Sequence, residues 1–290
     1  LFIDFDSSDF NISDNSLCPG GDADCIDDFM GTQNTSECGG GTTCDNGEVR
    51  LWGNCNLAGS SDGCKATGCY SIAETTYLYR EYENLCGGIP SDIEELVNLT
   101  DLRLPGNQFT GGIPEEIGNL TNLTYLDLRE NRLNDIPSEM QSLNDLVHLN
   151  LSYNNLSDNI PSYIFNFTSL TALYLNDNQF NGNISDEIGN LINLEFLNLG
   201  ANQLFGSIPP EIGSLPNLQE LYLYNNWNYD DDYNNSINGN IPPEIGGLIN
   251  LQRLDLNNNQ LSGSIPVEIE QLSNLNYLNL SSNQLSGSIP

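Results

Sequence analysis

The stretch from Leu251 to Asn274, LQRLDLNNNQLSGSIPVEIEQLSN, contains the pattern that decides the fold. Reduced to its recurring positions it reads LxxLxLxxNxLxGxIPxxIxxLxN, and partial copies of it fill the chain from Thr75 to Pro290. A pattern that recurs at a fixed period of about 20–50 residues predicts a stack of similar structural units. After a degenerate copy from Thr75, further copies start at Leu99, Leu123, Leu146, Leu170, Leu194, Leu218, Leu251 and Leu275, which gives nine units.

The first half of each unit predicts a short strand followed by an inward turn. In Leu254–Asp255–Leu256 the alternation buries both leucines and points Asp255 outward. The equivalent buried leucines are expected to be Leu126, Leu149, Leu173, Leu197, Leu221 and Leu254. An asparagine follows where the chain turns inward, and its amide can satisfy backbone groups left unpaired by the turn. These asparagines are Asn107, Asn131, Asn154, Asn178, Asn202, Asn226, Asn259 and Asn283.

The second half of the unit, Gly-x-Ile-Pro, predicts a single helical turn. Glycine allows an unusual backbone angle, isoleucine is buried, and proline starts the turn at a position where its missing N–H costs nothing. An acidic residue then suits the positive end of that turn. These acids are Asp92, Glu116, Glu139, Glu187, Glu211, Glu244 and Glu268.

Composition excludes several classes of function. The chain of 290 residues has 40 Asp and Glu against 7 Lys and Arg, a formal net charge of −33. Nucleic-acid binding is excluded because it depends on clustered basic residues. No apolar run is long enough to span a membrane. With His148 as the only histidine, neither catalysis nor a metal site is expected, and no cofactor is expected.

The cysteines mark a boundary in the chain. All eight lie within the first 86 residues, at Cys18, Cys25, Cys38, Cys44, Cys55, Cys64, Cys69 and Cys86. An even number of cysteines in an acidic, glycine-rich segment favours disulfides, which need an oxidising compartment. Zinc binding is disfavoured because no tight Cys-x-x-Cys pairs occur. We therefore expect a cysteine-rich N-terminal cap over 1–74 and a repeat domain over 75–290. Leu1 is read as the start of either a processed chain or a fragment.

The unit resembles the plant-type leucine-rich repeat of receptor-kinase ectodomains and polygalacturonase-inhibiting proteins. The resemblance implies an α/β right-handed solenoid with a concave parallel sheet and short 3-10 turns on the convex side, together with non-catalytic binding of extracellular proteins, peptides or glycans. Four departures stand out. Arg80 replaces a core leucine, the third unit lacks one residue and its glycine at 133–136, Asp158 replaces a glycine, and the seventh unit has an insertion at 227–236.

The outward strand positions define a candidate binding face. It is rich in aromatic and polar residues, which suit sugars or extended peptides, although strand propensity alone also favours tyrosine there. The predicted ligand-contacting residues are Tyr77, Tyr79, Arg103, Tyr125, Asp127, Arg129, Tyr174, Phe196, Tyr222, Tyr224, Arg253 and Tyr277, with Asn150, Asn176, Asn198, Asp255 and Asn279 on the same face. His148 is expected there as an exposed surface residue.

The insertion and the sequons extend this prediction. Trp227, Tyr229 and Tyr233 supply area for a partner, and Asp230 to Asp232 suit a basic partner or, less favourably, calcium. N-glycosylation motifs lie at Asn11, Asn34, Asn98, Asn119, Asn122, Asn150, Asn155, Asn166, Asn183, Asn234 and Asn279.

Three functions follow from these patterns. The first is an extracellular recognition glycoprotein, secreted or at the cell surface or matrix. The second is a structural glycoprotein that assembles head to tail, with the strand at Leu278–Asn279–Leu280 of one copy meeting the segment 1–5 of the next. The alternative explanation of the open last unit is that the chain is truncated. The third and weakest is an ice-binding or cell-wall protein, which would use rows such as Ser262, Ser264, Ser286 and Ser288, interrupted by Phe205, Cys86 and Gly112.

Overall fold

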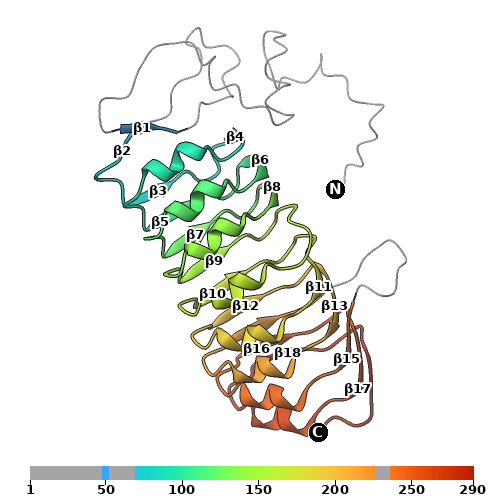
Figure 1. The fold of residues 1–290 in the computed structure, drawn as a ribbon. Coiled ribbons are helices and arrows are strands. Elements are labelled where there is room, and N and C mark those ends of the chain that lie inside the picture. The colour runs from blue at the N-terminus through green and yellow to red at the C-terminus, as the bar shows by residue number, and fades with distance from the viewer. Residues whose placement is uncertain (1–47, 52–68, 226–235) are drawn as a thin grey trace, which may run out of the picture.

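The computed structural model describes residues 48–51, 69–225 and 236–290, and they form a stack of similar turns (Figure 1). One strand from each turn joins a nine-stranded parallel sheet, in which each strand pairs with the strand of the next turn. In chain order the strands are β3 (Tyr77–Tyr79), β5 (Asp101–Arg103), β7 (Tyr125–Asp127), β9 (His148–Asn150), β10 (Ala172–Tyr174), β12 (Phe196–Asn198), β14 (Glu220–Tyr222), β16 (Arg253–Asp255) and β18 (Tyr277–Asn279). There is one strand for each predicted unit.

The leucine at the middle of each strand keeps the strands in register. Leu173, for example, pairs with Leu149 on one side and Leu197 on the other. All six leucines predicted for this row are fully buried, so the strand assignment and its inward face are confirmed. Because side chains alternate across a strand, the residues on either side of each leucine point away from the core.

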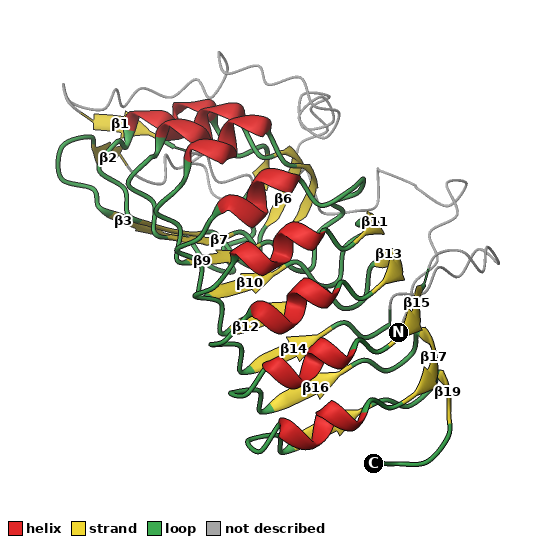
Figure 2. Ribbon diagram, turned by 60° about the horizontal axis from the view of Figure 1, so that its bottom comes forward, coloured by secondary structure: helices red, strands yellow, loops and turns green. Residues whose placement is uncertain are grey.

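Short 3-10 helices cover the side of the core opposite this sheet (Figure 2). They are η2 (Ser91–Glu95), η3 (Glu115–Asn119), η4 (Ser138–Ser142), η5 (Ser162–Asn166), η6 (Asp186–Asn190), η7 (Pro210–Ser214), η8 (Pro243–Gly247) and η9 (Val267–Gln271). The proline of the Ile-Pro pair stands at the start of the helical turn, as predicted. Pro90, for example, is the N-cap, with an extended ψ of 142° that leads the chain into the turn.

A second set of strands links the first sheet to the helices. A three-stranded sheet contains β4 (Cys86–Gly87), β6 (Gln108–Gly112) and β8 (Arg132–Asp135). A five-stranded sheet contains β11 (Asn181–Asn183), β13 (Gln203–Ser207), β15 (Ile237–Asn240), β17 (Gln260–Ser264) and β19 (Gln284–Ser286).

The gap between these two sheets falls at the units that depart from the motif. The shortened third unit forms β8, whose pairing with β6 shifts register between Gly111 and Gly112. In the fourth unit Asp158 adopts φ 65°, the left-handed region that glycine occupies at this position in other units, such as Gly182. In this second set of strands the fourth unit contributes one isolated bridge, between Asn159 and Asn181.

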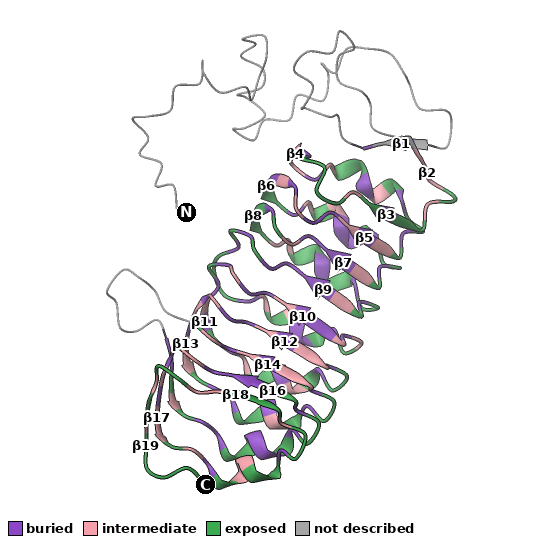
Figure 3. Ribbon diagram, turned by 180° about the vertical axis from the view of Figure 1, so that it is seen from behind, coloured by how far each residue is buried: buried purple, intermediate pink, exposed green. Residues whose placement is uncertain are grey.

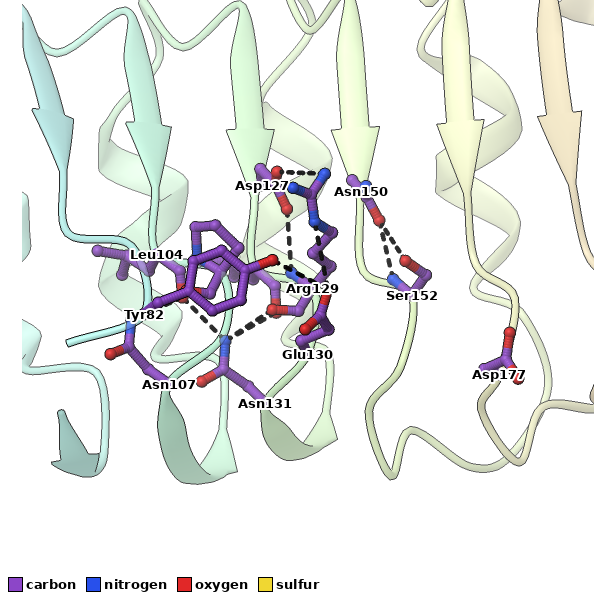
Figure 4. Close-up of polar contacts among 12 residues, drawn as sticks. Tyr82, Leu104, Asn107, Asp127, Arg129, Glu130, Asn131, Asn150, Ser152 and Asp177 are labelled. Atoms are coloured by element: carbon purple, nitrogen blue, oxygen red, sulfur yellow. Dashed lines mark hydrogen bonds and ion pairs between the residues drawn. The ribbon is translucent and has the colours of Figure 1, made fainter. Parts of the chain in front are cut away.

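Buried asparagines tie successive turns together. The Oδ1 atom of Asn131 accepts a hydrogen bond from the N–H of Phe109 in the preceding turn, at 3.1 Å. Its Nδ2 donates to the carbonyl oxygens of Leu104, Leu128 and Arg129 (Figure 4). This confirms the predicted structural role, because the amide satisfies backbone groups that no strand or helix pairs. We call these residues the asparagine ladder: Asn107, Asn131, Asn154, Asn178, Asn202, Asn259 and Asn283. The eighth predicted asparagine, Asn226, lies outside the described residues.

The first turn is covered by a pair of antiparallel strands, β1 (Glu48–Arg50) and β2 (Cys69–Ser71). Leu51 is fully buried in the same hydrophobic core as the repeats. Arg80, at the position of a core leucine, donates a hydrogen bond to the hydroxyl of Tyr70 in β2 and forms an ion pair with Glu83. The arginine in place of leucine is therefore explained by its contacts where the first turn meets β2. No helix among the described residues is long and apolar enough to cross a membrane.

Candidate binding face on the nine-stranded sheet

The outward side chains of the nine-stranded sheet form two rows. The first residue of each strand lies in one row and the third in the other, because every strand is three residues long and its middle leucine points inward. Adjacent side chains within a row lie about one strand spacing apart, ~4.8 Å. Figure 3 shows this sheet from the side opposite the view of Figure 1.

Five side chains on adjacent strands form a continuous stack, which we call the aromatic ladder: Tyr79, Arg103, Tyr125, His148 and Tyr174. The guanidinium carbon of Arg103 lies 4.8 Å from the ring centre of Tyr79 and 3.9 Å from that of Tyr125. Tyr125 stacks on His148 with centroids 4.0 Å apart and planes 2° apart, and His148 lies 5.6 Å from Tyr174. Such cation–π and stacking contacts hold the side chains in place before a ligand arrives.

Asp101 orients the first half of this ladder. Its carboxylate accepts hydrogen bonds from Nε and Nη2 of Arg103, at 2.8 and 2.7 Å, and from the hydroxyl of Tyr79, at 2.7 Å. The bond from Tyr79 raises the pKa of that hydroxyl, and the bond from Arg103 raises the pKa of the guanidinium. Asp101 is absent from the predicted site, although it occupies the same strand position as Tyr77 and Tyr125.

His148 was expected to be an exposed surface residue, and this was wrong. Its ring is packed between Tyr125 and Tyr174, and its Nε2 atom is buried with no hydrogen-bond partner among the described residues. Burial lowers the pKa of His148 to about 4, and the charges of Arg103 and Arg129 act in the same direction. The residue is therefore neutral at pH 7 and acts as a flat ring in the stack.

Acidification is expected to destabilise the wild-type protein more than a His148→Gln variant. The unfolded chain binds a proton with a pKa near 6.5, whereas folded His148 does so near 4. The stability that the neutral ring contributes is fully present above pH 6.5 and is lost as the pH falls toward 4. Thermal melting of both proteins across this pH range measures the effect. The many carboxylates titrate in both proteins, so the difference between the two reports on His148. Parallel loss of melting temperature in the two proteins would contradict it.

Several polar residues of the predicted face are buried, and this corrects the expected role of Asp127 as a ligand contact. Asp127 is only 2% exposed, forms an ion pair with Arg129 at 3.2 Å, and has its pKa raised by burial. Asn150 is 5% exposed, and its Oδ1 accepts hydrogen bonds from the N–H and hydroxyl of Ser152 (Figure 4). Asp255 is buried in the same way beneath its neighbours. Flanking side chains cover these three polar side chains. The buried polar groups therefore position other residues.

A second cluster lies on the last strands of the sheet. Tyr222 donates a hydrogen bond to Glu220 at 2.8 Å, and Glu220 lies 3.9 Å from Nε of Arg253. The guanidinium of Arg253 lies 5.4 Å from the ring centre of Tyr277, which donates to Asp255 at 3.1 Å. As in the aromatic ladder, an arginine lies over a tyrosine ring, and a carboxylate beside the arginine accepts a hydrogen bond from a tyrosine hydroxyl.

The remaining predicted contacts are dispersed. Tyr77 is exposed and lies 5.4 Å from Tyr79, and Phe196 is partly buried between the two clusters. Tyr224 lies against Gly200, where a Cβ atom would come within 2.6 Å of its ring. Trp227, Tyr229 and Tyr233, with the three aspartates beside them, fall outside the described residues.

The predicted glycosylation sites and cysteines differ in their exposure. The exposed sequon asparagines are Asn98, Asn119, Asn122, Asn155, Asn166 and Asn183, and Asn279 is partly buried. Asn150 is buried with its amide oxygen bonded, so a glycan does not fit there, contrary to expectation. Asn11, Asn34, Asn234 and the cysteines from Cys18 to Cys64 lie outside the described residues. Cys69 begins β2, and Cys86 begins β4, where it is partly buried.

Two further expectations concern surfaces away from this face. The serine rows lie on the five-stranded sheet, with Ser262 and Ser264 in β17 and Ser286 in β19, and Phe205 in β13 interrupts them. Within 48–51, 69–225 and 236–290, no three His, Cys, Asp or Glu side chains are grouped so that they could hold a metal ion.

Family models match the repeats directly. One, described as a leucine-rich repeat region, matches residues 80–232, and a second, described as a leucine rich repeat, matches residues 233–285. The chain is a leucine-rich repeat protein. The family inferred from the Gly-x-Ile-Pro unit is therefore confirmed, as is its solenoid fold. No curated protein sequence matches the chain.

Several solved structures that resemble this chain are ectodomains of plant receptors. The ectodomain of the Arabidopsis thaliana receptor kinase GASSHO1/SCHENGEN3, in complex with CASPARIAN STRIP INTEGRITY FACTOR 2, is 39% identical over 70% of this leucine-rich repeat protein, with a TM-score of 0.65. The Arabidopsis receptor kinase HAESA, in complex with the peptide hormone IDA and the co-receptor SERK1, is 37% identical over 74%, with a TM-score of 0.68. The chain spans 24% and 34% of the lengths of these two proteins.

A third neighbour has a different printed function. A plant ice-binding protein is 32% identical over 74% of this chain, with a TM-score of 0.61, and the chain covers 66% of its length. The repeat fold is thus shared by proteins that bind different ligands, so function has to be argued from the side chains of this chain.

Proposed function

We propose that this leucine-rich repeat protein is a non-catalytic extracellular recognition module that binds an extended peptide along the aromatic ladder. The continuity of the ladder over five adjacent strands carries the proposal. A peptide in an extended conformation places its side chains at regular intervals, and the ladder offers flat apolar surfaces flanked by hydrogen-bonding groups.

The charge distribution favours a peptide that carries a carboxylate. Of the 7 basic residues in this strongly acidic chain, Arg103, Arg129 and Arg253 lie on or beside the nine-stranded sheet. Elsewhere, excess acid repels an anionic ligand. The pair between Arg103 and Asp101 uses Nε and Nη2, so Nη1 retains donors for a ligand carboxylate. Neighbouring ectodomains crystallised with peptide hormones support the same class of ligand.

An extracellular location agrees with the cysteine-rich N-terminal region and the exposed sequons. We propose that the exposed asparagines Asn98, Asn119, Asn122, Asn155, Asn166 and Asn183 carry N-linked glycans. None of them belongs to the aromatic ladder, so glycans there leave the ladder accessible.

Selection from a displayed random peptide library tests this function. Peptides that bind the wild-type protein should bind an Arg103→Gln variant about tenfold more weakly or worse, because a desolvated, charge-assisted contact is lost. Arg132→Gln is the matched control, since Arg132 is an exposed arginine of β8, outside the nine-stranded sheet. Equal affinity of the selected peptides for Arg103→Gln and Arg132→Gln would exclude the ladder as their site.

A further inference from the structure

The residue immediately before each strand of the nine-stranded sheet changes character halfway along the stack. In the early turns it is mostly threonine, and its hydroxyl is bonded to the preceding turn. Thr100 donates to the carbonyl of Thr76 at 3.0 Å, and Thr124 donates to that of Thr100 at 3.1 Å. From the sixth turn on, longer polar side chains replace threonine. We call them the edge row: Glu195, Gln219, Gln252 and Asn276.

The edge row lines a hollow of about 560 Å³ at the edge of the sheet. Three asparagines from the loops before the strands complete its lining: Asn217, Asn250 and Asn274. Six of the seven lining side chains are thus amides, and one is a carboxylate. No aromatic-ladder residue lines this hollow, so it is separate from the proposed peptide site.

Hydrogen bonds hold these side chains in a fixed order. Nε2 of Gln219 donates to Glu195 at 2.8 Å, and Nε2 of Gln252 donates to Oε1 of Gln219 at 3.2 Å. The Nδ2 atoms of Asn217 and Asn250 donate to backbone carbonyls of the preceding turn at 2.9 and 2.8 Å. Each primary amide has two donors and an acceptor, so these bonds leave both kinds of group for a ligand.

Exposed apolar residues lie near the lining asparagines but outside the lining itself. They are Ile192, Pro216 and Ile249, and the last two directly precede Asn217 and Asn250. Asn217 donates to the carbonyl of Ile192, and Asn250 donates to that of Pro216, so the apolar and amide groups share one edge.

We propose that this hollow binds a neutral oligosaccharide. Sugar hydroxyls both donate and accept hydrogen bonds, as amides do. The lining has one carboxylate and no base in a chain of net charge −33, which disfavours anionic ligands. Lining groups recur at the strand spacing of ~4.8 Å, which is similar to the advance per ring of an extended β-linked chain. The proposal does not depend on peptide binding by the ladder.

Saturation-transfer NMR and titration calorimetry with cellohexaose, laminarihexaose and chitohexaose test the proposal on the full chain. At least one of these neutral hexasaccharides should bind the wild-type protein. A Gln219→Ala/Gln252→Ala double variant should bind it about tenfold more weakly or worse, because two hydrogen-bonding amides are lost. A Gln203→Ala/Gln284→Ala double variant, which changes two glutamines of the five-stranded sheet, should bind like the wild type.

Three results would overturn the proposal. The first is that none of the three hexasaccharides binds the wild-type protein. The second is that the double variant of Gln219 and Gln252 retains full affinity while its thermal melting matches that of the wild type. The third is that peptides selected on the wild-type protein lose affinity in this double variant, which would assign the hollow to peptide binding instead. Loss of saccharide binding with a lowered melting temperature is resolved by Gln252→Glu, which keeps the length of the side chain but removes its Nε2–H donors and should therefore also weaken binding.

Discussion

Replacing Leu197 by aspartate is expected to unfold the central turns of the solenoid. Leu197 is fully buried and lies between Leu173 and Leu221 in the central row of the sheet. No described basic side chain lies in this core to pair with a carboxylate. An isolated buried charge costs several kcal/mol, so we expect a loss of more than about 4 kcal/mol.

The stacked architecture makes this loss spread to neighbouring turns. Each turn buries its core only against the turns beside it, so the loss of one turn removes an interface from both neighbours. Circular dichroism melting should show the loss, and hydrogen exchange should show it first in β10, β12 and β14. Leu197→Met is the matched control, because a swap of similar volume usually costs less than about 1.5 kcal/mol. A melting curve of Leu197→Asp equal to that of Leu197→Met would refute the assigned register.

Replacing Asn202 by alanine is expected to cost about 3 kcal/mol or more. Its Oδ1 accepts the N–H of Phe180 at 3.0 Å, and its Nδ2 donates to the carbonyls of Leu175, Leu199 and Gly200 at 3.0 to 3.2 Å. Truncation leaves the Phe180 N–H buried without a partner, together with carbonyls that lose theirs. Each unsatisfied buried group costs about 1–3 kcal/mol.

Two other asparagines calibrate this expectation. Asn259 belongs to the asparagine ladder, but its buried Oδ1 has no hydrogen-bond partner among the described residues, in the turn that follows the insertion. Asn259→Ala should therefore cost less than Asn202→Ala. Asn217 is exposed and donates to one carbonyl, so Asn217→Ala should cost about 1 kcal/mol or less. Chemical denaturation measures all three, and equal losses at Asn202 and Asn217 would count against the structural role of the ladder.

The sequence by itself determined the repeat unit, the number of turns and the inward row of leucines. These features depend on local periodicity, because a strand of alternating residues buries every second side chain wherever it lies. The position of Asn131 was predictable for the same reason, since an asparagine recurs at this place in each unit, although two of its hydrogen bonds reach the preceding turn. The departures at 133–136 and at Asp158 also marked where the second layer of strands is interrupted.

The tertiary structure alone decided which outward residues reach the solvent. Asp127 and Asn150 point outward as predicted, yet side chains beside them bury both. His148 looked like a solitary surface residue until Tyr125 and Tyr174 were placed on either side of it. The hollow at the edge row likewise exists only because Glu195, Gln219 and Gln252 are brought side by side from separate turns. Such burial depends on the size of neighbours one repeat away, and no pattern within a single repeat contains that information.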